Sequence, residues 1–384
     1  MKCLSTKATS IKPSGIRKFF DLASTMEGVI SLGVGEPDFA TPWHICENAI
    51  HYMSTGHTHY TANRGLLELR EEICKFHKEH YNQVYDSENE VIVTIGGSEA
   101  IDLCMRALLN PGDEVIVLDP NYVAYAPSVI LSDGVVVPLK LKEENDFKIL
   151  PEDLKKVITP KTKAMIINYP SNPTGGVMTK EDYAKIIDII KESGIYVISD
   201  EIYAELSFDQ PFASLAQFDE IKSQIIVVNG FSKAYAMTGW RLGYCMANKE
   251  LSSVMNKIHQ YVIMSAPVMS QYAGIEAIKN GYNDVLMMKD DYLKRRNFLV
   301  NRLNRMGLKT NMPHGTFYVF CNIQSTGLDS ETFCERLLQE QKVACVPGNA
   351  FGNSGEGYVR ISYAYSIDHI KEAVVRLEQF LKGL

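Results

Sequence analysis

Residues 225–244 of the chain have the sequence IIVVNGFSKAYAMTGWRLGY. The apolar, β-branched run at 225–228 is typical of a buried strand, and a turn-rich segment with Ser232, Lys233 and Arg241 follows it. A lysine at the end of a buried strand can lose solvation, and its lowered pKa then makes it an amine nucleophile. Ser232 and Arg241 carry the hydroxyl and the planar guanidinium that suit a phosphate. An ordinary loop whose lysine faces water has the same short pattern, so the rest of the chain must decide.

Short apolar strands alternate with helical segments through the middle of the chain. Strands are expected at 91–95, 114–118, 135–139, 164–168, 195–199, 225–228 and 242–247, and helices at 98–109, 122–131 and 181–193. This alternation predicts an α/β domain in which helices cover both faces of a mostly parallel sheet.

The C-terminal part has a different pattern. A long helical region runs from about 251 towards 302 with a break at 281–282, and it is followed by expected strands at 317–321, 343–346 and 358–362 and helices at 330–340 and 367–381. This order is typical of a smaller α+β domain. We therefore expect a large domain at 46–280 and a small domain formed by 1–45, which contains a short helix at 16–23, and 281–384.

Composition excludes several classes of protein. The chain has 384 residues, 46% of them hydrophobic and 22% charged, which is ordinary for a globular protein. The net charge of -7 offers no basic field for nucleic acid or anionic lipid, and no apolar run is long enough to span a membrane or to form a signal peptide. The eight cysteines show no CxxC or metal-type spacing. We expect a cytoplasmic protein with free thiols, no metal site and a small-molecule ligand.

Polar residues gather where the expected strands of the large domain end. In open α/β sheets ligands bind beyond the carboxyl ends of the strands. Gly97, Ser98 and Glu99 join one strand to a helix, where backbone amides and the positive helix end would accept a phosphate. Ser98 as a simple helix cap is the alternative interpretation of that turn.

Two further strand ends carry an amide and a carboxylate. Asn172 lies in a turn rich in proline and glycine, which a purely structural turn would also explain. Asp200 directly follows the strand at 195–199, and a carboxylate there is costly unless it meets a cation or several donors. A protonated ring nitrogen would be such a cation, whereas an ion pair or a helix cap is the structural alternative.

Taken together, these motifs resemble a known family. Asn172-Pro173, Asp200-x-x-Tyr203, Ser232-Lys233 and Arg241 are similar, in order and separation, to the pyridoxal-phosphate (PLP) aminotransferases of class I and II. The resemblance is nearest to bacterial and archaeal aspartate and aromatic aminotransferases, and it extends over essentially the whole chain, from 14–18 through 35–39 to 357–362. It implies fold type I, with a mostly parallel seven-stranded sheet sandwiched by helices and a smaller α+β domain.

The resemblance also implies roles at the cofactor ring. Lys233 would bind PLP covalently and later act as the base that moves the substrate Cα proton. Asp200 would keep the pyridine nitrogen protonated, so that the ring accepts electrons. Tyr203 and Asn172 would donate hydrogen bonds to the 3′ oxygen of the ring, and Tyr122 would stack on its face.

The phosphate and the substrate would be held by a further set of residues. The phosphate partners implied by the resemblance are Ser232, Arg241, the amides around Gly97, Ser98 and Glu99, and Tyr60 from the neighbouring subunit of a homodimer. Arg360 would clamp the substrate α-carboxylate through two parallel hydrogen bonds, which lysine cannot do. Gly35, Ile16 and Asn172 would line the same pocket, although simple helix packing also explains Ile16. No residue is assigned to the substrate side chain: Arg64 and Arg106 are candidate cations for which roles on a helix surface serve equally well.

The implied reaction moves an amino group from an L-amino acid, aromatic or aspartate-like, to 2-oxoglutarate by a ping-pong mechanism. A C–S β-lyase on the same fold is the alternative. A PLP-binding transcriptional regulator would need a helix-turn-helix domain before the core, and it is not expected because the core motifs begin by Ser14.

Overall fold

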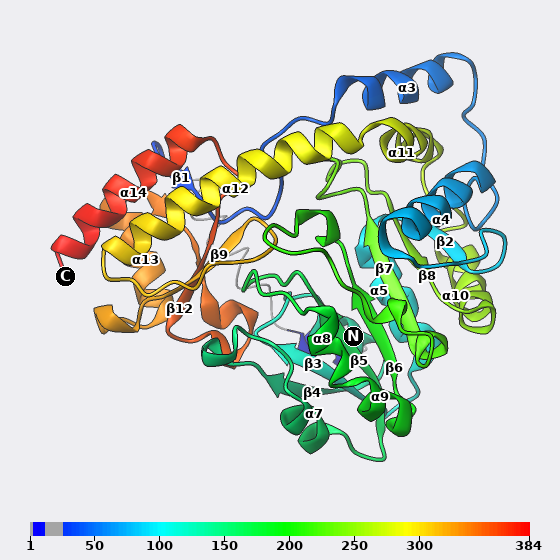
Figure 1. Cartoon of the computed structure of the whole chain (residues 1–384), viewed down its shortest axis with the longest axis horizontal. Helices are drawn as coiled ribbons and strands as arrows, with labels where there is room; N and C mark the ends of the chain where they lie inside the picture. Colours follow the sequence, from blue (N-terminus) through cyan, green and yellow to red (C-terminus); the bar gives the residue numbers. More distant parts are fainter. Residues whose placement is uncertain (1–2, 12–25) are drawn as a thin grey trace.

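A seven-stranded sheet forms the centre of the computed structural model, which describes residues 3–11 and 26–384 (Figure 1). In spatial order its strands are β2 (Val91–Thr94), β8 (Gly243–Met246), β7 (Ile225–Gly230), β6 (Tyr196–Asp200), β5 (Thr162–Asn168), β3 (Glu114–Asp119) and β4 (Val135–Lys140). Strand β8 runs antiparallel to both neighbours, and all other neighbours are parallel. The predicted α/β architecture with a mostly parallel seven-stranded sheet is therefore confirmed.

Strand β7 shows why these sequences form a sheet that is covered on both faces. Successive side chains of a strand point to opposite faces. Ile225 and Val227 belong to one hydrophobic core, and Ile226 and Val228 belong to another on the opposite face. Because both faces are buried, the strand has a continuous apolar run in place of an alternating pattern.

Helices surround this sheet and continue into the C-terminal part. Their bounds are α1 (Thr6–Ser10), α3 (Trp43–Ser54), α4 (Leu67–Tyr81), α5 (Gly96–Leu108), α6 (Tyr125–Leu131), α7 (Pro151–Val157), α8 (Lys180–Ala184), α9 (Ile187–Ser193), α10 (Lys249–Val262), α11 (Val268–Asn280), α12 (Tyr282–Arg305), α13 (Ser330–Gln341) and α14 (Ile367–Lys382). The helix expected at 181–193 is two helices, and the long region expected from 251 is three. Pro267 precedes α11 and Gly281 separates α11 from α12, so both breaks follow from residues that interrupt helices.

A second, smaller group of strands lies beside the C-terminal helices (Figure 1). Strand β12 (Tyr358–Ser362) pairs antiparallel with β11 (Val346–Pro347) and with β9 (Tyr318–Asn322). Strand β1 (Ile30–Ser31) pairs with β10 (Val343–Ala344), which joins an N-terminal segment to the C-terminal part. This part has its own hydrophobic core around α12, α13 and α14. The exact division at 46 and 280 stays a prediction, and so does the helix at 16–23, which lies outside the described residues.

The order of the strands decides where polar residues meet. Strands β5, β6 and β7 are adjacent and parallel, and Asn168, Asp200 and Val228 lie level with one another across them. The carboxyl ends of these strands therefore form one edge, at which the loops after β5, β6 and β7 begin. Across the part of the chain that the structure describes, no helix is long and apolar enough to cross a lipid bilayer.

Candidate active site

A cavity of about 530 Å³ lies at this edge, between the main sheet and the small sheet, within the size range of small-molecule sites. Its walls come from loops that are far apart in the sequence. Among the site residues predicted from the sequence, those that line the cavity are Gly35, Gly97, Ser98, Tyr122, Asn172, Asp200, Tyr203, Ser232, Lys233, Arg241 and Arg360.

Lys233 follows β7 and points its amine into this cavity. Nζ donates a hydrogen bond to the carbonyl oxygen of Gly35 at 2.6 Å. Burial, together with the positive charges of Arg360 and Arg241, lowers the pKa of Lys233 to about 8, while Glu36 and Asp200 partly oppose this shift. The neutral, nucleophilic form of the amine is therefore much more accessible near neutral pH than that of an ordinary lysine.

Asp200 ends β6 and is buried at the floor of the cavity. Its carboxylate accepts hydrogen bonds from the hydroxyl of Tyr125 at 2.7 Å and from the amide of Ile202 at 3.2 Å. Burial raises the pKa of Asp200 to about 6, and these two hydrogen bonds oppose the rise. No cation of the described chain forms an ion pair with Asp200. A buried carboxylate that faces a cavity in this way fits a ligand with a positively charged ring nitrogen.

Tyr203 and Asn172 place two polar groups beside this carboxylate. The Tyr203 hydroxyl lies 3.0 Å from the hydroxyl of Tyr318, and burial raises the pKa of Tyr203 so that it stays a proton donor. The backbone amide of Asn172 donates to Asn168 Oδ1 at 2.9 Å, which fixes the loop after β5. Both residues are buried and line the cavity.

Arg360 approaches the cavity from β12 and is only 3% exposed. Its Nη1 donates to Asn172 Oδ1 at 2.8 Å and its Nη2 donates to Gly33 O at 2.6 Å. The guanidinium lies 4.2 Å from the ring centroid of Tyr318 and 4.8 Å from that of Phe351. Its buried Nε has no hydrogen-bond partner, and Arg360 pairs with no carboxylate in the described ranges. This arrangement fits an anionic ligand group.

The opposite end of the cavity is built for an anion as well. Helix α5 begins here, and its first amides and positive dipole end point to where Gly97 and Ser98 line the cavity. Gly96 has a φ of 68°, which L side chains rarely adopt, and a Cβ there would lie 2.7 Å from Nη2 of Arg241, so glycine suits the start of the helix beside this guanidinium. Ser232 adds a buried hydroxyl. A hydroxyl, a guanidinium and helix amides together suit a phosphate.

Among the described residues, two predicted site residues, Glu99 and Tyr60, do not line the cavity. The Glu99 carboxylate points away, where it accepts a hydrogen bond from the amide of Ile95 and lies 2.6 Å from Nδ1 of His259. Only the backbone of Glu99 remains available for the predicted phosphate contact. Tyr60 is 82% exposed, as a residue that serves another subunit would be. Ile16 lies outside the described residues.

The two candidate cations for a substrate side chain lie elsewhere. Arg64 donates to Ser252 Oγ at 2.7 Å and to Val91 O at 3.4 Å. Arg106 pairs with Asp102 at 2.7 Å along the surface of α5. Neither arginine lines the cavity. The role on a helix surface holds for Arg106, whereas it is wrong for Arg64, which lies partly buried in the turn before α4 and binds β2 and α10.

Two tyrosines of the site were missed in the sequence. Tyr125 contacts Asp200 and lies three residues after Tyr122, and this helical spacing could have placed both on one face. Tyr318 belongs to a strand that the sequence predicts, yet nothing local relates it to Tyr203, which is 115 residues away.

The residues present fit PLP together with an amino acid. The cavity is lined by a phosphate-type site at α5, a buried carboxylate, an amine and a guanidinium that pairs with no carboxylate among the described residues. The chemistry of this set matches the phosphate, the ring nitrogen, the aldehyde and the substrate carboxylate, in that order.

Comparisons with known proteins agree with this site. The family model for aminotransferases of class I and II matches residues 27–377. An aromatic-amino-acid aminotransferase of Thermococcus litoralis is 43% identical, covering 99% of this chain and 98% of its own, and an aspartate aminotransferase of Pyrococcus abyssi is 44% identical with the same coverage. The crystal structure of an aromatic aminotransferase from Pyrococcus horikoshii is 43% identical, covers 96% of this chain and 99% of its own, and superposes with a TM-score of 0.91.

In the cofactor-free protein, we expect Lys233 to react with an amine-acylating reagent at a rate that rises with pH around a midpoint near 8. The neutral amine is the reactive form, and exposed lysines have an ordinary pKa of about 10.4. Peptide mapping by mass spectrometry measures the modification of each lysine, with the exposed lysines of the same chain as internal controls. A midpoint above about 10 at Lys233 would contradict the lowered pKa.

Proposed function

The chain belongs to the class I and II aminotransferases, which depend on PLP. From this premise we propose that it moves an amino group from an aromatic or aspartate-like L-amino acid to 2-oxoglutarate by a ping-pong mechanism. The observation that carries the proposal is the convergence of Lys233, Asp200 and Arg360 on one cavity, in which neither Asp200 nor Arg360 forms an ion pair within the described chain. The two relatives described above, one an aromatic and one an aspartate aminotransferase, support both donor classes.

Each residue at the ring would have a separate task in this reaction. When bound, PLP supplies an electron sink for negative charge at the substrate Cα. Asp200 would hold the proton on the ring nitrogen, since its buried carboxylate is stabilised by a cation. Tyr203 and Asn172 would donate hydrogen bonds to the ring oxygen. Lys233 Nζ would take the proton from the substrate Cα, because its lowered pKa makes the neutral amine more accessible than in an ordinary lysine.

The remaining residues would bind and orient. Arg360 would accept the α-carboxylate in its planar fork, which fixes the bond to be broken relative to the ring. Ser232, Arg241 and the first amides of α5 would hold the phosphate. Tyr122, which lines the cavity, would stack on the cofactor, and Gly35 would offer its backbone close to the substrate. A Cβ at Gly35 would collide with the Tyr318 hydroxyl.

A homodimer with shared active sites is part of the same proposal. Asn63 donates to the carbonyl of Met264 at 2.8 Å, which places the loop of Tyr60 beside the end of α10. Tyr261, at that end, is 86% exposed, so two large aromatic side chains lie uncovered in one region. We propose that the partner subunit covers them and that Tyr60 reaches the partner's phosphate site. Sedimentation equilibrium that finds only monomer at assay concentrations would contradict this assembly.

A reducing cytoplasm is the proposed location. All eight cysteines carry free thiols. Even Cys334 and Cys345, whose sulfurs lie 3.4 Å apart at hydrogen-bond distance, form no disulfide. Such thiols persist in a reducing compartment. Localisation of a tagged chain to an oxidising compartment would contradict the proposal.

A panel of amino acids tests the proposed reaction. Mixed one by one with the PLP-loaded protein, an aromatic amino acid or aspartate is expected to convert the cofactor to its amine form, followed by absorbance. Lys233→Ala should abolish this conversion because no other lysine lines the cavity in the described chain. Conversion of the cofactor at the full rate in Lys233→Ala would contradict the role of Lys233. Release of pyruvate and ammonia from cystathionine without an oxo acid would support the β-lyase instead.

Arg360→Leu is expected to raise KM for the amino donor at least about tenfold, because the α-carboxylate loses a charge-assisted pair of hydrogen bonds. Steady-state kinetics with the best donor of the panel measure the effect. Arg106→Leu is the control, since this arginine lies on the surface of α5, and its KM should match that of the unmodified protein. An unchanged KM in Arg360→Leu refutes the clamp.

A further inference from the structure

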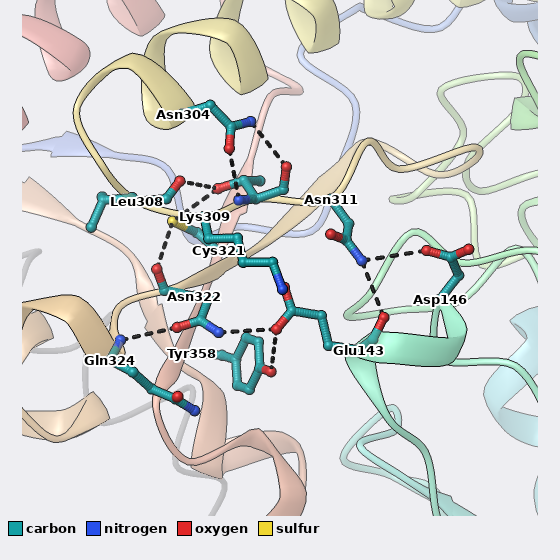
Figure 2. Close-up of polar contacts among 11 residues, drawn as sticks. Glu143, Asp146, Asn304, Leu308, Lys309, Asn311, Cys321, Asn322, Gln324 and Tyr358 are labelled. Atoms are coloured by element: carbon teal, nitrogen blue, oxygen red, sulfur yellow. Dashed lines mark hydrogen bonds and ion pairs between the residues drawn. The ribbon is translucent and has the colours of Figure 1, made fainter.

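The carboxylate of Glu143 connects the turn after β4, the edge strand of the main sheet, to the small sheet. Glu143 begins the short 3-10 turn η1 (Glu143–Asn145), which follows β4, and its side chain is only 13% exposed. Figure 2 shows this carboxylate beside Tyr358, Asn322 and Lys309, all of which belong to the C-terminal part of the chain. Its Oε2 accepts hydrogen bonds from the Tyr358 hydroxyl at 2.9 Å and from Asn322 Nδ2 at 3.0 Å, and Lys309 Nζ lies 3.4 Å from Oε1.

The two hydrogen-bonded residues hold the small sheet at one level. Tyr358 begins β12 and Asn322 ends β9, and their Cα atoms are direct partners across the antiparallel pair. One carboxylate therefore fixes two neighbouring strands at the same point. The backbone amide of Asn322 also donates to the backbone carbonyl of Lys309 at 3.1 Å, so the three partners of Glu143 are connected with one another.

An apolar layer supports the polar contact. The Tyr358 ring stacks on Phe320 with 4.8 Å between centroids and 2° between planes. Phe147, which follows η1, packs edge-on against both rings at 5.8 and 6.0 Å. Phe320 is the direct Cα partner of Arg360. A chain of contacts therefore runs from Glu143 through Tyr358 and Phe320 to the strand position of Arg360.

A second pair of hydrogen bonds fixes the backbone of the same turn. Asn311, in the segment between α12 and β9, donates through Nδ2 to Glu143 O at 3.3 Å and to Asp146 Oδ1 at 3.3 Å (Figure 2). The turn is therefore held through its side chain and its main chain. This leaves little freedom for β12 to shift against the main sheet.

Arg360 depends on that placement. It lies two residues after Tyr358 on β12, hence on the same face of the strand, and its guanidinium must cross to Asn172 on the main-sheet side. A hydrogen bond of 2.8 Å tolerates little displacement. We propose that Glu143 is a positioning residue that holds β12 so that Arg360 meets the substrate carboxylate. This inference rests on the proposed function, in which Arg360 binds that carboxylate.

A merely stabilising role for Glu143 predicts a different result. Loss of general stability lowers the unfolding temperature or the amount of folded protein, and it leaves KM of the folded fraction unchanged. Loss of positioning raises KM for the amino donor and weakens binding of an unreactive carboxylate, whereas PLP affinity stays the same because Glu143 touches no cofactor-side residue.

Glu143→Gln, which keeps the shape and removes the charge, is the test variant. Glu144→Gln is its matched control, since Glu144 occupies the same turn, is 69% exposed and pairs only with Lys142 at 3.4 Å among the contacts described. With L-phenylalanine and with L-aspartate as donors, we expect Glu143→Gln to raise KM about fivefold and to change kcat less than about twofold. The dissociation constant of 3-phenylpropionate should rise in parallel, and that of PLP should stay constant.

Tyr358→Phe gives a second, milder variant that keeps the ring stack and removes one donor to Glu143. Its KM should rise in the same direction, and the double variant should show less than the sum of the two effects because both act on one contact. A wild-type protein that transfers no amino group refutes the proposed function itself. Where the wild type is active, an unchanged KM and 3-phenylpropionate affinity in Glu143→Gln, or an equal loss of PLP affinity, overturns the positioning role.

Discussion

The guanidinium of Arg360 is removed from water, yet it contacts no carboxylate within the described residues and its Nε has no partner. An ion loses several kcal/mol of hydration on burial, and this loss is offset only by a counterion or by hydrogen bonds. Two acceptors and two aromatic faces stabilise Arg360 in part. The rest of the offset has to come from an anion that enters the cavity. The buried carboxylate of Asp200 likewise forms no ion pair among the described residues, and burial raises its pKa. Burial lowers the pKa of Lys233, which favours the uncharged form of its amine.

The fold holds these groups in place through two independent structures. Parallel strands β5, β6 and β7 bring Asp200 and Lys233 to one edge because their carboxyl ends coincide. Arg360 comes from a different sheet, so contacts between the two sheets set its distance from the others. Under the positioning role proposed for it, Glu143 supplies one of these contacts, and a residue outside the cavity would then affect substrate binding. The position of Arg360 relative to Asp200 and Lys233 therefore depends on the contacts between the main sheet and the small sheet.

Much of the fold and of the site could be predicted from local sequence. Apolar runs that end in Asp200 or lead to Lys233 indicate strands and their ends without reference to the rest of the chain, and the family resemblance is confirmed. Helices at 43–54, 67–81 and 151–157 were not predicted.

The contacts between the main sheet and the small sheet could not be predicted from the sequence. The contacts of Glu143 with Asn322 and Tyr358 span 179 and 215 residues. Nothing in the residues around Glu143 distinguishes it from the exposed Glu144 beside it. Side-chain direction at a site follows from local patterns only where the partners share a strand end or a helix face, and here they share neither.

In the proposed reaction, Lys233 is the amine that burial and the nearby positive charges prepare for covalent binding of PLP. Titration of the cofactor-free protein with PLP, followed by borohydride reduction and peptide mapping, tests this role most directly. The account predicts one equivalent of cofactor per chain, fixed covalently at Lys233. Reduction that distributes the label over surface lysines and leaves Lys233 unmodified would contradict it.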